Sequence, residues 1–538
     1  MKRLPSGFLF LLAAAALPGP VAAQLVGSAF QVAAGTTLEH PAVAYGAGSG
    51  NQYLVVWLAP TATTTAELRG QFVGFAGTPT GAPFVIEAAV DRAVPPALCH
   101  VRRTDEFVVG YRRRALGTFS DTNWYVRTIA AAGGAVSNRE VVPFDAATTG
   151  ELTELVLGGD ARVLLLLPDD RALLVVRRAG PTGGQPSIAY ALVTTLGADP
   201  VVGTFTTLSS PGVPVGDIAV TERAGDEFAG HWLVVWCQSV GLSPFTSVRG
   251  RLVDTDGVAC GASTTLHTGL VSVRNPTVAV RDTDEFAVAW EHGADIRVRS
   301  VAFTGTCAAP AFTLGTTVDP TSGTDNSEPA LAFARDKFLL AWRRSPTPFP
   351  AGILVRGLDP DACIACGQEW APSYPVAAQG QPALGARYAA GDLTSDEALT
   401  VWADGAIVAR RFEAMAEDLV LNLGGGCTNT GYANAATHDG ECVIGNDSFR
   451  LVLGAPTVPA LALIVGFSAI SFPCGACTIV PSPDLLLPGA TPTTVPIPCD
   501  TMLIGTHLWS QWLLLKPSTC PLLPDFSFTN ALRFTIGE

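Results

Sequence analysis

The sequence predicts an all-β protein: a seven-bladed β-propeller closed by an N-terminal strand and followed by a small antiparallel β-sandwich. Two observations lead to this fold class. A strand-rich unit recurs seven times within residues 24–418, and a cysteine-rich stretch of short strands fills residues 419–538. Helical periodicity is nearly absent from both regions, so a helical or mixed fold is not expected.

The most regular part of the repeat is an apolar strand that ends in a large side chain. Its seven copies end at Trp57, Tyr111, Val176, Trp236, Trp290, Trp342 and Trp402. A shorter apolar strand, often opened by proline, precedes each copy, and a strand that ends in a turn follows it. Units of about four strands repeated at a fixed period are typical of a β-propeller. The Trp-Asp dipeptide of WD40 proteins does not recur, so that family is excluded.

The last unit predicts how the ring closes. Its third strand lies near residues 407–412, and no fourth strand follows before the next domain. A matching segment stands at the start of the chain, at Ala29–Ala33. We expect this segment to complete the seventh blade, which would leave no open sheet edge.

The N-terminus has the features of a secretory signal peptide. Lys2 and Arg3 precede the apolar stretch Phe8–Leu17, and small residues end at Ala23. We therefore expect residues 1–23 to be removed and the mature protein to be secreted or associated with the cell surface. No later apolar run reaches the length of about 18 residues that a membrane span needs, so no transmembrane segment is expected after cleavage.

Charge excludes some partners. The net charge is −14 and the isoelectric point is about 5.0. A general electrostatic attraction to nucleic acid or to anionic lipid is therefore not expected. We expect an extracellular polysaccharide or protein as the partner, and the sequence leaves the oligomeric state open.

The mature chain resembles a class of secreted bacterial proteins in which degenerate propeller repeats precede a small C-terminal sandwich. The resemblance is carried by L-V-V-W-type strands in the repeats and by four segments of the tail: Gly445–Leu453, Leu463–Ser468, Val495–Pro498 and Asn530–Gly537. Such tails follow many unrelated N-terminal regions. The resemblance therefore implies an extracellular attachment or export-associated module rather than an enzyme core.

Twelve cysteines, an even number, fit an oxidising compartment. Two C-x-x-C pairs, Cys363/Cys366 and Cys474/Cys477, could bind zinc or carry redox chemistry, but structural disulfides are the better reading in an exported protein. Bridging within each pair is one alternative, and the six cysteines of the tail allow 15 connectivities. For the remaining tail cysteines we expect Cys427–Cys442 and Cys499–Cys520.

Motifs of catalysis are missing from the sequence. No G-x-S-x-G elbow is present, and the seven histidines show no H-E-x-x-H spacing. The segment Asp254–Gly257 begins like a calcium loop but lacks the further ligands, so it reads as a turn. No cofactor, metal or catalytic residue is predicted on these grounds.

The tetrapeptide T-D-E-F occurs twice and places two acids side by side, Asp105 with Glu106 and Asp284 with Glu285. Adjacent residues of a strand point to opposite faces, and equivalent turns of different blades lie far apart, so these acids cannot form a catalytic pair. We expect turn initiation by the aspartate and a solvated glutamate.

Basic and aromatic residues follow the second strand of several units and predict a binding rim opposite the T-D-E-F turns. The candidates are Arg112, Arg113, Arg114, Trp124, Arg177, Arg178, Phe245, Arg343 and Arg344. Guanidinium groups suit an anionic polymer such as an acidic polysaccharide, whereas salt-bridged arginines on ordinary loops are the alternative.

The leading functional prediction is therefore a non-catalytic binding or scaffolding protein at the cell surface or in the extracellular matrix. The alternative is a secreted glycan-active hydrolase or lyase with a site in the central channel of the propeller. A cluster of convergent acids at the mouth of that channel would favour the enzyme. A third possibility is that the propeller makes only protein–protein contacts.

Overall fold

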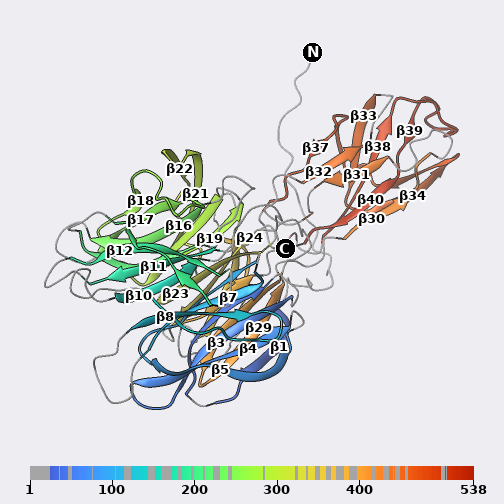
Figure 1. Ribbon diagram of the computed structural model, residues 1–538. Coiled ribbons are helices and arrows are strands. Elements are labelled where there is room, and N and C mark those ends of the chain that lie inside the picture. Colours follow the sequence, from blue (N-terminus) through green and yellow to red (C-terminus); the bar gives the residue numbers. More distant parts are fainter. Residues whose placement is uncertain are drawn as a thin grey trace. The chain divides into compact units, whose positions relative to one another are not determined.

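The structure is a computed structural model (Figure 1). It describes residues 25–537 except 36, 47–50, 75–76, 103, 114–122, 143–151, 159–170, 180–184, 196–198, 210–212, 222–230, 240–244, 283–284, 322–324, 335–336, 346–351, 359–364, 371–380, 387–396, 414–418, 428–434, 440–441, 443–448, 455–458, 499–502 and 504–505. Every secondary-structure element within these ranges is a β-strand, which confirms the all-β prediction. The chain divides into two compact units, one covering Leu25–Ala414 and the other including Met415–Glu538.

In the described part of the first unit the strands form seven antiparallel sheets; six are built from strands that follow one another in the chain, and the last joins β27, β28 and β29 to β1. The first strands are β2 (Glu39–Gly46), β6 (Ala97–Val101), β10 (Leu152–Gly158), β15 (Val215–Val220), β19 (Val273–Asp282), β23 (Asn326–Ala334) and β27 (Ala383–Ala386). The second strands are β3 (Gln52–Pro60), β7 (Glu106–Arg112), β11 (Arg171–Arg178), β16 (Trp232–Ser239), β20 (Glu285–His292), β24 (Lys337–Arg344) and β28 (Glu397–Asp404). Each first strand contacts the first strands of the neighbouring sheets, and β2 also contacts β27. This arrangement is propeller-like.

The outer strands complete the sheets. The third strands are β4 (Thr65–Gly74), β8 (Trp124–Ala130), β12 (Ser187–Thr194), β17 (Phe245–Val253), β21 (Asp295–Thr306), β25 (Gly352–Leu358) and β29 (Ala406–Glu413). Outside them lie β5 (Pro79–Asp91), β9 (Glu140–Val141), β13 (Val201–Val202) with β14 (Thr206–Thr207), β18 (Thr264–Thr268), β22 (Ala309–Leu314), β26 (Ala365–Trp370) and, in the last sheet, β1 (Leu25–Ala33).

The second strands form the core because both of their faces are covered by neighbouring sheets. All eight residues of β16 are buried, which explains why these segments read as continuous apolar runs rather than alternating ones. The large residues that end the repeat motif are enclosed: Trp236, Trp290 and Trp342 are fully buried. Truncation of one such side chain typically costs about 3–5 kcal/mol, so they hold adjacent sheets together.

Strand β1 pairs antiparallel with β29, with Phe30 opposite Ala409 and Ala33 opposite Ile407. One apolar cluster joins Val32 and Ala33 to Trp57 of the first sheet and to Val401 of the last. The segment expected to pair with the last unit is therefore found beside it.

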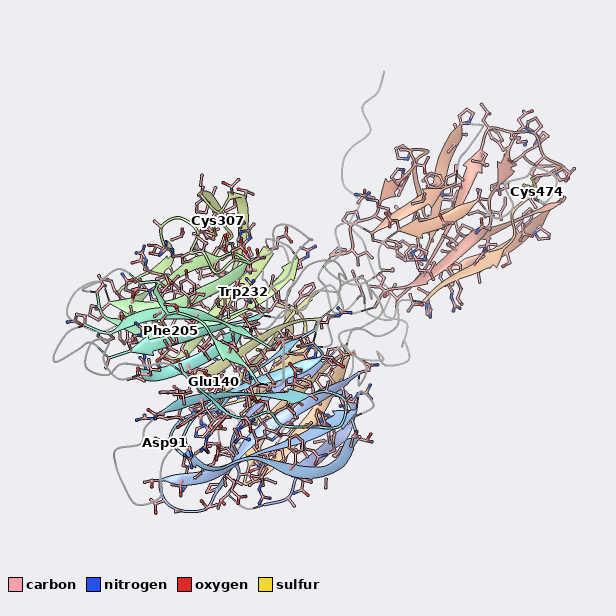
Figure 2. All side chains as sticks on the ribbon, viewed as in Figure 1. Asp91, Glu140, Phe205, Trp232, Cys307 and Cys474 are labelled. Carbon is pink, nitrogen blue, oxygen red and sulfur yellow. A yellow bond between two sulfur atoms is a disulfide. The ribbon has the colours of Figure 1, made fainter. Side chains whose placement is uncertain are left out.

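A disulfide that the sequence did not predict links Cys260 to Cys307. Cys260 follows β17 and Cys307 lies in the turn between β21 and β22 (Figure 2), so the bond joins two neighbouring sheets. Nothing in the spacing of 47 residues indicates this pair, because each cysteine belongs to a different repeat.

The second unit contains three sheets within its described residues. The largest runs β30 (Leu419–Gly424), β40 (Ala531–Thr535), β38 (His507–Leu514), β33 (Ala460–Gly466) and β36 (Leu485–Pro488), with β39 (Ser527–Phe528) beside β38. The others are β31 (Ala436–Asp439), β32 (Arg450–Leu453) and β37 (Thr493–Thr494), and the hairpin β34 (Ala469–Cys474) with β35 (Cys477–Pro481).

The disulfides of this unit correct the predicted pairings. Cys427 bonds to Cys477, and Cys474 to Cys520. The expected bridges Cys427–Cys442 and Cys499–Cys520 are therefore wrong, and the alternative of a bridge within the Cys474/Cys477 pair is not the one formed. Cys474 and Cys477 stand opposite each other at the end of the β34–β35 hairpin, and each sulfur reaches a different neighbouring segment instead of its partner.

The other cysteine predictions lie partly outside the described residues. Cys363 and Cys499 are among the positions that the structure does not describe, and only the backbone of Cys366 is described. Cys442 is buried. Bridging between Cys363 and Cys366 stays a prediction.

At the first T-D-E-F copy Asp105 lies in a turn as expected and Glu106 begins β7, but the expected solvated glutamate is wrong there. Asp105 has a φ of +52°, and its carboxylate lies 3.2 Å from Nε2 of His100. Glu106 is half-buried, and this burial raises the pKa of its carboxyl group. At the second copy Glu285 is exposed and lies 3.2 Å from Arg281; Asp284 is outside the described residues.

Candidate active site

The strand register identifies one position that recurs at the start of every first strand. In each unit the second-last residue of the repeat motif pairs with a residue of the first strand, as Val56 pairs with Ala42 and Ala289 with Thr277. The recurring position lies two residues before that paired residue. The seven occupants are His40, Pro95, Glu154, Asp217, Asn275, Glu328 and Gln381. Register shifts occur at this place in the sheets of β2, β10, β15, β19 and β23. Bulges of this kind often re-aim side chains next to active sites.

A second recurring position directly follows the large residue of the repeat motif. Its occupants are Leu58, Arg112, Arg177, Cys237, Glu291, Arg343 and Ala403. Because each second strand pairs with its own first strand, these side chains lie beside the first set. We call the two sets together the polar ring.

A pocket of about 380 Å³ opens at the polar ring. Glu154, Arg177, Asp217, Asn275 and Gln381 contribute its polar lining. A second cavity of about 220 Å³ is lined by residues of all seven first strands, most of them apolar, such as Tyr45, Leu98 and Leu331. Polar chemistry is therefore concentrated at one end of these strands.

Two carboxylates of the pocket share one guanidinium group. Nε of Arg177 lies 3.2 Å from Oε2 of Glu154, and its Nη1 lies 3.8 Å from Oδ1 of Asp217. The backbone N–H of Ile218 donates to Oε1 of Glu154 at 3.2 Å, and that of Asn275 donates to Oδ2 of Asp217 at 3.0 Å. Contacts from three sheets thus hold both acids beside one guanidinium group.

The carboxyl group of Glu154 is an unusually weak acid. Burial raises the pKa of its carboxyl group to about 7; Arg177 lowers it, Asp217 raises it and the Ile218 N–H lowers it by smaller amounts. A carboxylic acid that still holds its proton near neutral pH can donate that proton to a leaving group. Asp217 accepts a hydrogen bond from the backbone N–H of Asn275 and lies beside the same guanidinium group.

Further acids surround this pair. Nε of Arg343 lies 3.1 Å from Oε2 of Glu328, and burial raises the pKa of Glu328, with Arg343 lowering it and Glu291 raising it. Oε1 of the buried Glu291 accepts hydrogen bonds from Nδ2 of Asn275 at 2.7 Å and from the backbone N–H of Glu328 at 2.6 Å. The carboxylates thus form one connected network.

Three members of the polar ring have a left-handed backbone. The φ angles are +49° at His40, +47° at Asn275 and +55° at Glu328, and a proline follows each of them. This conformation is rare for residues other than glycine and is further disfavoured before proline. It costs on the order of 1–3 kcal/mol at each position and tends to occur at functional sites.

Three of the predicted rim arginines, Arg112, Arg177 and Arg343, belong to the polar ring, where each lies beside a carboxylate. Arg112 lies 3.7 Å from Asp91, Arg177 contacts Glu154, and Arg343 contacts Glu328. Arg178 stacks 4.9 Å from the ring centre of Phe205, and Arg344 is buried. Arg114 lies outside the described residues.

The aromatic candidates are core residues. Trp124 is 2% exposed, and its Nε1 donates to the carbonyl of Leu152 at 3.1 Å. Phe245 is half-buried against the cluster that contains Cys237 and Trp290. Trp124 is therefore enclosed, and Phe245 is partly covered.

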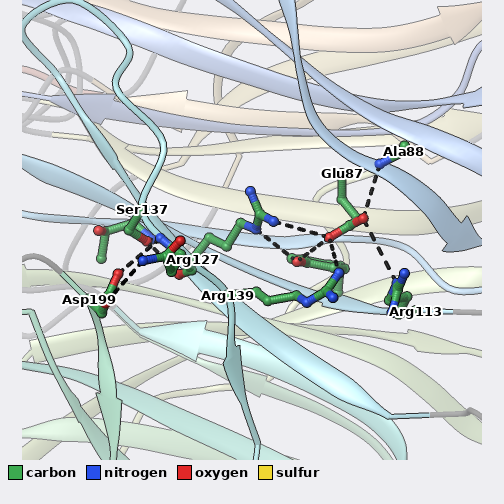
Figure 3. Close-up of polar contacts among 10 residues, drawn as sticks. Glu87, Ala88, Arg113, Arg127, Ser137, Arg139 and Asp199 are labelled. Carbon is green, nitrogen blue, oxygen red and sulfur yellow. Dashed lines mark hydrogen bonds and ion pairs between the residues drawn. The ribbon is translucent and has the colours of Figure 1, made fainter.

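Arg113 belongs to a cluster around the buried Glu87 (Figure 3). The carboxylate of Glu87 lies 3.9 Å from Nε of Arg113, 3.3 Å from Arg127 and 3.5 Å from Arg139, and it accepts a hydrogen bond from Tyr111 at 3.0 Å. Burial raises the pKa of Tyr111 above its usual range. The cluster ties the first sheet to the second.

The Asp254–Gly257 segment forms the expected turn. Oδ1 of Asp254 accepts hydrogen bonds from the backbone N–H groups of Asp256 at 3.0 Å and Val258 at 2.7 Å. Asp254 also lies close to Cys260 and Cys307, but these cysteines are bonded to each other and offer no thiolate to a metal.

The described part of the chain contains no helix that could span a membrane.

No protein-family model matches this chain, and no curated protein matches it. The resemblance to secreted propeller proteins with sandwich tails is therefore supported only for the propeller-like all-β fold.

The chain is similar to several solved structures at low identity. A protein of unknown function from Dyadobacter fermentans is 13% identical, with 61% of this chain and 98% of that chain covered and a TM-score of 0.37. The α-L-arabinanase of Penicillium chrysogenum, complexed with arabinobiose, is 9% identical, with 72% and 99% covered and a TM-score of 0.39. An exo-β-1,3-galactanase from Phanerochaete chrysosporium is 8% identical, with 88% and 96% covered and a TM-score of 0.35.

The leading prediction, a non-catalytic binding or scaffolding protein, is corrected. The similar structures named above with a stated activity are an α-L-arabinanase and an exo-β-1,3-galactanase. The arginines that suggested a binding rim are instead paired with carboxylates or stacked on a ring wherever their contacts are described. Sequence reasoning missed the acids of the polar ring, because their identity differs from sheet to sheet.

Proposed function

We propose that this protein is a glycan-active hydrolase whose site is the pocket at the polar ring. The observation that carries the proposal is the pair of carboxylates, Glu154 and Asp217, held on the Arg177 guanidinium, with the pKa of Glu154 raised to about 7. Two carboxyl groups in different protonation states are what the cleavage of a glycosidic bond requires.

In this proposal Glu154 is the general acid and Asp217 is the second carboxylate. Glu154 gives its proton to the glycosidic oxygen as the bond to the anomeric carbon breaks, so the leaving sugar departs as a neutral alcohol. Asp217 either takes a proton from the attacking water or attacks the anomeric carbon itself. Arg177 neutralises the carboxylate that Glu154 becomes. Asn275 and Gln381 line the same pocket and supply amide groups for sugar hydroxyls.

The proposal extends to the architecture and the setting of the enzyme. The seven sheets form the blades of one propeller, spanning residues 24–418, and β1 closes it by pairing with β29. Residues 419–538 form a sandwich with its own disulfides. Disulfide bonds in both units and the leader-like residues 1–23 support secretion, and an extracellular polysaccharide is the expected substrate.

The test is a hydrolysis assay on neutral polysaccharides, with arabinan and β-1,3-galactan included, using the wild-type protein and the variants Glu154→Gln and Asp217→Asn. Each substitution keeps the shape of the side chain and removes the acid, so we expect a loss of about 10²–10⁴-fold in kcat. Glu285→Gln, which changes an exposed carboxylate on β20, is the matched control.

Full activity in both variants would remove Glu154 and Asp217 from the reaction and contradict the proposal. Where activity is found, NMR of the first-formed anomer distinguishes the two roles of Asp217, because retention indicates a nucleophile and inversion indicates a base.

A further inference from the structure

Glu291 is an enclosed carboxylate that connects the polar ring but does not touch the pocket. It directly follows the buried Trp290, and 1% of its surface is exposed. Among the described residues, those that line the pocket do not include it. Its Oε1 accepts hydrogen bonds from Nδ2 of Asn275 and from the backbone N–H of Glu328, and its Oε2 lies 2.5 Å from Nε of Arg274.

Both residues that Glu291 holds have an unfavourable backbone. Asn275 and Glu328 both have positive φ angles and both precede proline. Such a conformation persists only where the surroundings enforce it. A single carboxylate oxygen that bonds both residues is suited to this task, since it ties neighbouring sheets at the same level of the polar ring.

The conformation of Asn275 has a direct consequence for the proposed chemistry. With this backbone, the N–H of Asn275 donates to Oδ2 of Asp217 at 3.0 Å. Asp217 then lies beside Arg177, and Arg177 beside Glu154. A chain of contacts therefore runs from Glu291 through Asn275 to the pair of acids.

We propose that Glu291 is a positioning residue of the site: it holds Asn275 and Glu328 in the left-handed conformation and thereby fixes Asp217 beside Glu154. This inference rests on the proposed function for the roles of the two acids. The charged groups that face Glu291 and its partners are Arg274, Glu328 with Arg343, and Asp217.

Two substitutions separate positioning from charge. Glu291→Gln removes the charge but keeps an oxygen that can accept both hydrogen bonds, so it should preserve the site. Glu291→Asp keeps the charge but shortens the reach, so it should release Asn275 and Asp217 as Glu291→Ala does. Asn275→Gly supplies a rescue, because glycine adopts positive φ without support and retains the N–H that Asp217 needs.

The measurement is the titration of the Glu154 carboxyl group by NMR in protein labelled with ¹³C in glutamate, with the resonance assigned by its loss in Glu154→Gln. In the wild-type protein we expect a midpoint at about 7. The negative charge of Asp217 raises the pKa of Glu154, so release of Asp217 moves the midpoint to lower pH in Glu291→Ala and Glu291→Asp. Glu291→Gln should titrate like the wild type, and Asn275→Gly should reduce the effect of Glu291→Ala.

Three outcomes would overturn the inference. A wild-type midpoint in both Glu291→Ala and Glu291→Asp would mean that Glu291 does not position the acids. A shift in Glu291→Gln as large as in Glu291→Ala would mean that the charge acts directly, and an Asn275→Gly background without rescue would remove Asn275 from the chain of contacts. The titration needs no substrate, so its failure is distinct from a failure of the hydrolysis assay.

Discussion

The acidity of Glu154 makes a prediction about stability as well as catalysis. Its pKa is raised from an ordinary value of 4.5 to about 7 by burial, so the folded state binds the proton more tightly than the unfolded state. The contribution of the protonated group is fully present below pH 4.5 and is lost as the pH rises through 7. A difference of about 2.5 in pKa corresponds to about 3 kcal/mol, since each unit is worth about 1.4 kcal/mol. About a quarter of the side chain is exposed, so solvent screening makes this an upper value.

Glu154→Gln removes this dependence, because the amide does not ionise. We therefore expect the free energy of unfolding of the variant to increase, relative to that of the wild type, by up to about 3 kcal/mol between pH 4.5 and pH 8.5. Urea unfolding of the full chain, followed by tryptophan fluorescence and fitted with separate transitions for the two units, measures it. Glu285→Gln, at an exposed site, should show no such divergence. Parallel pH profiles for Glu154→Gln and the wild type would refute the raised pKa.

Three further predictions concern the framework of the first unit. Replacing Cys260 and Cys307 together by serine should lower the stability of that unit by about 2–4 kcal/mol, as measured by its unfolding midpoint without reductant; an unchanged midpoint would mean that the bond adds no constraint. Trp342→Ala should cost about 3–5 kcal/mol in the same assay, because the side chain is fully buried and its Nε1 donates to Asn326 at 3.0 Å; a loss under 1 kcal/mol would contradict its role in the core. Deleting residues 25–33 should leave β29 as an open edge and produce concentration-dependent association in sedimentation, whereas a monomer of full stability would argue against closure by β1.

The sequence predicted the core well because the core repeats. Each second strand is enclosed on both faces, so its apolar run survives in every copy and ends at a buried side chain such as Trp57 or Trp402. The pairing segment at Ala29–Ala33 was predictable for the same reason, since a missing strand is noticeable in a regular series.

The candidate site was not predictable in this way, because it consists of differences between the repeats. Proline marks the start of the first strand after His40, Asn275, Glu328 and Gln381, but the sheets that carry Glu154 and Asp217 have no proline there. Only the strand register shows that all these residues are equivalent. The sequence predicted Arg177 and Arg343 as candidates. Their carboxylate partners lie more than 14 residues away in the chain, and only the fold brings each arginine and its partner together.

The predicted disulfide pairings were wrong for a related reason. A short spacing such as that of Cys474 and Cys477 suggests a local bridge, yet the two residues stand at a hairpin end from which each sulfur bonds to a distant segment, at Cys520 and Cys427. Connectivity of this kind is set by the packing of sheets and not by spacing.

The pairing of β1 with β29 determines when the first unit can finish folding. These strands stand at opposite ends of the unit in sequence, so β1 lacks its partner until β29, which ends at Glu413, has been synthesised. Until then the apolar segment L-V-G-S-A-F-Q-V-A has no partner, and β29 has an unpaired edge once it emerges. Contacts between residues so far apart in the sequence form slowly, and the partly folded intermediates that lack them are prone to aggregation. We therefore expect the yield of folded protein to depend on keeping its first strand from aggregating while the rest of the first unit is made.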